Sequence, residues 1–529
     1  MAKRKLKILG LTQGQNIDLL DQLLKTIQNE GLADIEESVA LASFAGHFIS
    51  SNVGRDGLPV LKFIKEWEIV EEARLMSPGD VDLEWLRQQL GGGSIWRSFI
   101  GDRRFIYGRR SKSIQDYRVH YKNDFFNTLA FCFVKTIDKT LNELQPDIVL
   151  GFTAVTFGEL ITLELCRARG VPAIQLHSSR IGNYFAFHNE LTGTSSHIKR
   201  LLDAPNLISR HSYDVAREEV EKIRATGLIY EGVNVKIRNG KPFRPIEALR
   251  HLPSALKQEM QRLHSPVRRN DHHDPGSFFP WFYNYIRQPA RAANVTRFLR
   301  NSNRTVALTE LENLGDFAFF PLHSEPEVAL QVLAPPYHKN QIELIRNIAM
   351  SLPFGMKLVV KEHPRSFGLR PVNFYRTLLE IPNLYIVPMQ ANSIEISRHA
   401  ELVCVISSTI GLEACCIGKP VLLLGHAKYE AMPASMCAVC ENLFELPAVI
   451  ESLLNTYHYD EEALVKFLAA VIEGSVPIDL YSVLLGKPGR HSDGRQGLSL
   501  ADKITEDYKL LANYTVSRID EEMKDPSGS

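Results

Sequence analysis

Short apolar runs recur through the C-terminal half of the chain, between about Arg304 and Cys440. Each run is nearly continuous in hydrophobicity and is bounded by polar or turn-forming residues. The runs are FAFFPLH (317–323), KLVVKEH (357–363), LYIVP (384–388), LVCVIS (402–407) and PVLLLG (420–425). Continuous apolar character is typical of strands that are covered on both faces, so we predict a buried β-strand at each run.

Segments with helical periodicity alternate with these strands. Within 338–353, one stripe of a helix would carry Ile342, Ile345, Ala349 and Leu352. Shorter helices are predicted at PVNFYRTLLEI (371–381), SIEISRHA (393–400) and TIGLEACCIG (409–418). Because strands that alternate with helices form parallel sheets, the predicted fold class is α/β and Rossmann-like.

The same alternation is present near the N-terminus. Strands are predicted at LKILGLT (6–12), PDIVLGF (146–152) and VPAIQLH (171–177), with a helix at 155–170 that ends at Gly170. Residues 211–300 are polar and helix-rich, and an amphipathic helix precedes the polar tail KDPSGS.

Four regions follow from this reading. They are an N-terminal Rossmann-like domain (1–210), a helical insertion or connector (211–300), a C-terminal Rossmann-like domain (301–460) and C-terminal helices (461–529). Two facing Rossmann-like domains bind their ligand in the cleft outside the carboxyl ends of the strands.

Composition narrows the class of protein. The chain has 529 residues, of which 44% are hydrophobic and 23% charged, as is typical of globular proteins. Lys plus Arg and Asp plus Glu each number 61, so no net charge favours nucleic acid or a membrane surface. No apolar run approaches the roughly 20 residues that span a bilayer, and the short basic start is not a signal peptide. We therefore expect a cytoplasmic protein with no nucleic-acid partner, and leave peripheral membrane association open.

The cysteines do not form a disulfide framework. Seven are scattered along the chain, including the pair Cys437 and Cys440. This pair has the spacing of half a zinc site, but no second pair accompanies it. We favour buried free thiols in a reducing compartment.

Polar residues follow three predicted strands at the edge where a ligand is expected. They are LHSEPE (322–327), KEHP (361–364) and SST (407–409). Ser407, Ser408 and Thr409 stand at a strand-to-helix turn, where hydroxyls and helix N-terminal amides can bind a phosphate. The alternative is that they only cap the helix.

The KEHP turn supplies further candidates. Pro364 stiffens the turn and holds His363 at the strand tip, where its imidazole could donate to a phosphate, a base or a ribose oxygen. Lys361 could supply positive charge to a phosphate, and Glu413 could accept hydrogen bonds from ribose hydroxyls. The alternative for Lys361 is that it is an ordinary surface charge, and the alternative for Glu413 is that it only complements the helix dipole.

The N-terminal domain also carries candidate residues near its predicted strand ends. Glu159 begins the helix after a predicted strand and is a candidate general acid or base, with a helix-dipole role as its alternative. Arg180 and Asn183 follow the strand at 171–177 and could orient a sugar carboxylate or phosphate. Glu325 and Glu327 are the other acidic candidates.

The segment WRSFIGDRRFIYGRRSKS (96–113) is strongly basic, with aromatic residues between its charges. Arg103 and Arg104 could bind an anionic glycan or a lipid-linked phosphate. A solvated basic face is the alternative, and nucleic acid is disfavoured because the rest of the chain is not basic.

The sequence also resembles a known family. The series FFPLHSEPE, GMKLVVKEHP and SSTIGLEACCIGKPVLLLG, over about residues 315–430, resembles the capsular polysaccharide biosynthesis family, which includes bacterial β-Kdo transferases and is similar to bacterial sialyltransferases in its HP and SS/ST motifs. A weaker resemblance covers 140–190. The acidic D/E-D/E-G motif of some sialyltransferases has no clear counterpart here.

The resemblance implies a GT-B glycosyltransferase of surface polysaccharide synthesis. In the related enzymes the HP histidine and the SS/ST hydroxyls hold the nucleotide of a CMP-sugar, which would assign His363, Ser407, Ser408 and Thr409 to a CMP-linked Kdo- or sialic-type donor. By the same resemblance, the acceptor would be a glycan or lipid-linked glycan on the N-terminal domain (1–210), and the nucleotide sugar would bind the C-terminal domain (301–460). Helix N-terminal amides and cations can stabilise a departing phosphate without a metal, so we expect neither a catalytic metal nor a cofactor. A UDP-sugar transferase, a UDP-sugar 2-epimerase and a non-catalytic assembly protein are the alternatives.

Overall fold

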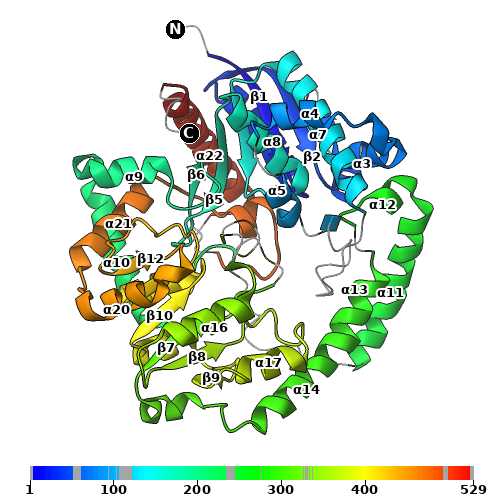
Figure 1. Ribbon diagram of the computed structural model, residues 1–529. Coiled ribbons are helices and arrows are strands. Elements are labelled where there is room, and N and C mark those ends of the chain that lie inside the picture. Colours follow the sequence, from blue (N-terminus) through cyan, green and yellow to red (C-terminus); the bar gives the residue numbers. More distant parts are fainter. Residues whose placement is uncertain are drawn as a thin grey trace.

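Two parallel-rich sheets, each covered by helices on both faces, form the core of the protein (Figure 1). The computed structural model describes residues 4–51, 61–92, 95–102, 104–105, 122–233, 245–274, 276–325, 327, 330, 332, 334–335, 338–492 and 498–524. Within these residues, no helix is both long and apolar enough to cross a membrane.

The N-terminal sheet has seven strands. Their spatial order is β13 (Val476–Pro477), β6 (Tyr184–His188), β5 (Ala173–Ser178), β4 (Ile148–Phe152), β1 (Lys5–Thr12), β2 (Asp34–Ala42) and β3 (Leu61–Lys65). In this order, neighbouring strands from β5 through β4, β1 and β2 to β3 pair in parallel. Strand β6 pairs antiparallel with β5, and β13 pairs antiparallel with β6. The predicted strands at 6–12, 146–152 and 171–177 are therefore neighbours around β1 and β4.

The C-terminal sheet has six strands, and its pairs are parallel. Their order is β12 (Cys437–Val439), β11 (Val421–Leu423), β10 (Leu402–Val405), β7 (Phe317–Pro321), β8 (Lys357–Lys361) and β9 (Leu384–Val387). The five apolar runs correspond to β7 to β11. Cys437 and Cys440 are buried free thiols, as expected.

Alternate residues of a strand enter opposite cores, which explains why the runs are continuously apolar. In β1, Leu9 and Leu11 face one cluster while Ile8 faces another. The first cluster holds α3 (Glu66–Leu75), α7 (Asn123–Leu144) and α8 (Phe157–Ala168), and the second holds α1 (Asn16–Asn29) and α22 (Leu500–Lys524).

The C-terminal sheet is covered in the same way. One face carries α16 (Gln341–Ser351), α17 (Val372–Leu379) and α20 (Leu446–Thr456). The other carries α18 (Ser393–His399), α19 (Thr409–Cys416), α9 (Ser196–Asp203), α10 (Arg210–Thr226) and α21 (Glu461–Glu473). The helices predicted at 338–353, 371–381, 393–400 and 409–418 are α16 to α19.

A helical arc joins the two domains along one side of the molecule (Figure 1). It consists of α11 (Pro245–His264), α12 (Pro266–Asn270), α13 (Phe278–Phe282), a π-helical turn (Tyr283–Arg287) and α14 (Gln288–Arg300). At one end α12 packs against α3 and α2 (Ala45–Ser50), and at the other α14 packs against α17. Smaller helices are α4 (Leu83–Gln89) and α5 (Trp96–Gly101).

After α21 the chain returns to the N-terminal domain. Strand β13 pairs with β6, with Val476 opposite Phe185, and α22 packs on α1 (Figure 1). Segment 461–529 is thus divided, since α21 covers the C-terminal sheet and α22 the N-terminal one. Two Rossmann-like domains in one chain form a GT-B architecture, which confirms the predicted fold class.

Replacing Leu511 with Ala tests this return of the chain. Leu511 is fully buried in α22 among the side chains of α1 and β1, so the substitution should lower the free energy of unfolding by about 2–5 kcal/mol. Leu500→Ala in the same helix is the matched control, because Leu500 is 64% exposed. Chemical denaturation of both variants checks the prediction, and equal stability would contradict it.

Candidate functional site

A cavity of about 430 Å³ lies between the two domains, at the carboxyl ends of both sheets. Its N-terminal wall comes from the residues after β4 and β5, and its C-terminal wall from those after β7, β8, β10 and β11. This is where parallel sheets present their strand-end loops. Six predicted site residues line it, namely His363, Ser407, Ser408, Thr409, Arg180 and Glu327.

The serine turn forms the N-terminal end of α19. Ser408 has an extended backbone, and its hydroxyl accepts a hydrogen bond from Ile410 N at 3.2 Å, so it caps the helix. The hydroxyl of Tyr429 donates to the Ser408 carbonyl at 2.5 Å. A Cβ on Gly411 would lie 2.1 Å from that hydroxyl, so glycine is required for this approach. Ser408 therefore both caps α19 and lines the cavity.

His363 is fixed in one tautomer. Its Nδ1 accepts a hydrogen bond from Arg365 N at 3.1 Å, so the neutral ring carries its proton on Nε2. Burial, and then the cation Arg365, lower the pKa of His363 to about 3. Near neutral pH this imidazole is an uncharged donor at the cavity wall.

His323 is a site residue that sequence reasoning missed, although it stands in the LHSEPE turn. Its Nε2 accepts from Ser407 N at 3.2 Å, which joins the turn after β7 to the turn after β10. Burial, and then Arg370, lower its pKa to about 3, so it too is neutral. A polar residue directly after a buried strand was the available signal.

A buried guanidinium braces these turns from behind. Arg370 is fully buried, pairs with Glu362, and donates to the His323 carbonyl at 2.7 Å. The hydroxyl of Tyr375 donates to Glu362 at 2.6 Å. Glu325 lies 3.4 Å from Arg370 and belongs to this brace rather than to the cavity lining.

Lys428 is a second cavity residue that sequence reasoning missed. Its Nζ lies 3.2 Å from His188 Nδ1. Burial lowers the pKa of Lys428 to about 7, and the carboxylates of Glu430 and Glu190 only partly oppose this effect. The lysine is thus able to change its charge near neutral pH.

Arg180 occupies the opposite wall in a left-handed conformation, with φ of 66°. Its guanidinium lies over the ring of Tyr230 at 4.9 Å and donates to the Tyr230 hydroxyl at 3.0 Å. Glu327 lies across the cavity and pairs with Arg365 at 3.4 Å. The cavity therefore carries cations on both walls and one carboxylate.

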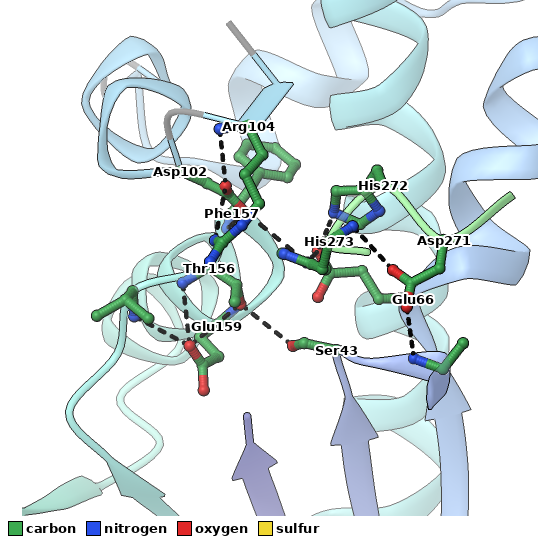
Figure 2. A network of polar contacts seen from close by, with 12 residues as sticks. Ser43, Glu66, Asp102, Arg104, Thr156, Phe157, Glu159, Asp271, His272 and His273 are labelled. Atoms are coloured by element: carbon green, nitrogen blue, oxygen red, sulfur yellow. Dashed lines mark hydrogen bonds and ion pairs between the residues drawn. The ribbon is translucent and has the colours of Figure 1, made fainter. Parts of the chain in front are cut away.

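Glu159 serves its own helix. It is fully buried, accepts hydrogen bonds from the amides of Val155 and Thr156 at 3.0 Å, and completes a capping box with the Thr156 hydroxyl (Figure 2). Burial raises its pKa to about 7 despite these bonds. Its carboxylate does not line the cavity, whereas Thr153 and Ala154 of the same loop do.

Other predicted residues also lie off the cavity lining. Lys361 donates to the Ser393 hydroxyl at 2.9 Å, and burial lowers its pKa to about 8. Glu413 accepts from Leu228 N at 2.8 Å, and burial raises its pKa to about 7. Pro364 follows His363 in the turn, and the Asn183 carbonyl accepts from Ile478 N at 2.9 Å.

The basic segment is only partly described. Arg104 contacts Asp102 at 3.5 Å and stacks over Phe44, away from the cavity lining. Arg103 and residues 106–121 lie outside the described residues, so the acceptor role given to Arg103 stays a prediction.

Among solved structures, similar folds have low identity. The β-Kdo 2,7 transferase KpsC of Thermosulfurimonas dismutans is 14% identical with a TM-score of 0.35, covering 72% of this chain and 89% of that one. The UDP-GlcNAc 2-epimerase of Methanocaldococcus jannaschii is 13% identical with a TM-score of 0.24, covering 91% and 99%. HepE of Anabaena, in complex with UDP and glucose, is 10% identical with a TM-score of 0.23, covering 97% and 100%. Likeness at these scores does not establish function.

Sequence comparison is more direct. No curated protein matches the chain. Residues 283–433 match the family model described as capsule polysaccharide biosynthesis protein, and they contain β7 to β11 with the KEHP and SST turns. The similarity to this family therefore covers the end of the helical connector and most of the C-terminal sheet.

Proposed function

We propose that this protein is a glycosyltransferase of surface polysaccharide synthesis. It would take a sugar, of the Kdo or sialic type, from a CMP-linked donor and pass it to a glycan or lipid-linked glycan acceptor. The observation that carries the proposal is the cavity between two carboxyl sheet edges, with the cap of α19, His363 and Lys428 on one wall and Arg180 on the other. The family match at 283–433 supports it.

The C-terminal wall suits a departing phosphate. Transfer breaks the bond between the sugar's anomeric carbon and the nucleotide phosphate, so negative charge develops on the phosphate oxygen. The N-terminal amides of α19, the His363 Nε2 proton and the Lys428 ammonium would stabilise that charge. These donors belong to the folded chain and need no catalytic metal or cofactor.

The acceptor hydroxyl must lose its proton when it attacks. Of the three carboxylates considered from sequence, Glu327 lines the cavity, while Glu159 caps α8 and Glu325 supports Arg370. We therefore assign the base to Glu327. Arg180 would orient the carboxylate of the donor sugar or an acidic acceptor.

The proposal includes a cellular location. The enzyme would lie in the cytoplasm, in peripheral contact with the inner membrane face, where a lipid-linked acceptor could be presented. Flotation of the pure protein with acidic vesicles would report that contact separately from catalysis.

CMP should raise the melting temperature more than UDP at the same concentration, because a ligand that binds only the native state stabilises it by mass action. His363→Ala should diminish the CMP shift. A hydrogen bond to a charged phosphate is worth about 1.5–3 kcal/mol, which corresponds to about a ten- to hundredfold loss of affinity. Thermal unfolding and calorimetric titration measure the two effects.

His458→Ala is the control, since His458 is exposed and does not line the cavity. A larger melting-temperature shift with UDP than with CMP would indicate that the donor is a UDP-sugar. Conversion of a nucleotide sugar without acceptor would identify an epimerase, and binding without turnover on any acceptor would favour an assembly protein.

Nucleotide affinity should fall between pH 7 and pH 9. The Lys428 pKa of about 7 means that its ammonium is present below this pH and is lost above it, although a bound phosphate shifts the loss upward. The second phosphate ionisation has its midpoint near pH 6, so it is nearly complete at pH 7 and changes little above that pH. Calorimetric titration with CMP should show up to about a tenfold loss per pH unit.

Lys428→Met is the comparison, because it should bind CMP weakly at every pH in this range. If the variant keeps the wild-type slope, the titrating group is another one, such as Lys361, and the assignment of Lys428 fails.

Glu327→Gln should reduce sugar transfer by about 10²–10⁴-fold while CMP affinity stays within about threefold, because the amide cannot accept the proton. Release of CMP in the presence of acceptor measures transfer. Glu159→Gln is the matched variant. It should keep most activity but lose about 0.5–2 kcal/mol of stability through its capping box. If Glu159→Gln loses sugar transfer while Glu327→Gln keeps it, the base is Glu159 instead.

A further inference from the structure

Four ionisable side chains converge in a buried cluster of the N-terminal domain, apart from the cavity lining (Figure 2). They are Glu66 at the start of α3, Asp102 just after α5, and His272 and His273 between α12 and α13. None is more than 2% exposed. One ligand atom from each lies within 4.8 Å of all the others.

The spacing of these atoms fits a tetrahedral metal site. The Nε2 atoms of His272 and His273 each lie 3.1 Å from Glu66 Oε1, and His273 Nε2 lies 3.9 Å from Asp102 Oδ2. When a metal ion holds nitrogen and oxygen ligands at about 2.0–2.2 Å in a tetrahedron, neighbouring ligand atoms are about 3.3 Å apart. Two imidazoles and two carboxylates form a ligand set that zinc accepts.

The charges of the buried side chains also favour a bound cation. Glu66, Asp102 and the adjacent Asp271 are three buried carboxylates, while Arg104 is the cation that contacts one of them, at 3.5 Å from Asp102. Burying unpaired negative charge is costly. A divalent cation would remove this conflict.

The side chains are already held in place. Asp102 Oδ2 accepts from Phe157 N at 3.1 Å, and Asp271 accepts from His273 N at 2.8 Å and from Ala45 N at 3.0 Å. The His272 ring stacks on Phe105 at 4.2 Å, and the His273 ring packs against Phe44 at 4.4 Å. Such outer contacts orient ligands before an ion arrives.

We propose that Glu66, Asp102, His272 and His273 bind one divalent transition-metal ion, Zn²⁺, as a structural site. The ion would fasten the helical connector, through His272 and His273, to α3 and to the residue after α5. Because its ligands are buried and filled by protein, the site leaves no open position for substrate, which distinguishes it from a catalytic zinc. It does not depend on the proposed transferase activity.

The test begins with tag-free protein purified without chelator. Elemental analysis should find about one zinc per chain. Removal of the ion with 1,10-phenanthroline should lower the melting temperature by several degrees, and added Zn²⁺ should restore it. Co²⁺ added to the stripped protein should give the visible absorption of a tetrahedral N/O site.

Variants separate this site from adventitious binding. His272→Asn and His273→Gln should each lose at least about tenfold in Zn²⁺ affinity, whereas His264→Ala, at an exposed position of α11, should bind like the wild type. If a variant does not fold, the cobalt spectrum of the wild type still decides. Stripped wild-type protein that shows neither a melting shift with Zn²⁺ nor a cobalt band would overturn the proposal, as would undiminished zinc in both variants.

Discussion

The buried guanidinium of Arg370 organises the C-terminal edge of the cavity. It pairs with Glu362 after β8 and donates to the carbonyl of His323 after β7, and His323 in turn accepts from Ser407 after β10. One cation thereby joins three neighbouring strand ends. A buried charge persists only when its partners are well placed, so the turns cannot shift independently without leaving it unpaired.

This constraint explains why the cavity walls differ in character. Behind the C-terminal wall the polar groups hydrogen-bond to one another. Contacts with neighbouring groups also hold His363 and Lys428, which fixes the positions of the His363 Nε2 proton and the Lys428 ammonium. The N-terminal wall depends more on backbone, with Arg180 in a left-handed conformation and the loop before α8 held by its capping box. Fixed donors are what charge stabilisation in a transition state requires.

Much of the fold can be predicted from local sequence pattern, because buried parallel strands have continuous apolar sequences bounded by turn-forming residues. The sequence analysis did not predict the parallel strands β2, β3 and β12 or the antiparallel strands β6 and β13. Strand β13 has two residues and pairs with a strand far away in the sequence, so periodicity alone does not reveal it. Strand-end reasoning found His363 and the serine turn, but not Lys428, whose pKa depends on packing from both domains. The Thr156–Glu159 pair does carry a capping-box signature in sequence. His272 and Glu66 are 206 positions apart, and no local signal joins them.

The return of the chain to the N-terminal sheet has a consequence for biosynthesis. Every strand of the second sheet lies between Phe317 and Val439, so that sheet is complete once this stretch has left the ribosome. The first sheet lacks its last strand until β13 is made, and the face that α1 and α22 share stays only partly covered until α22 is made. Domains usually mature in the order of their synthesis. Here the domain that starts first finishes last, and the apolar side chains that α22 will cover stay exposed while the second domain is being translated.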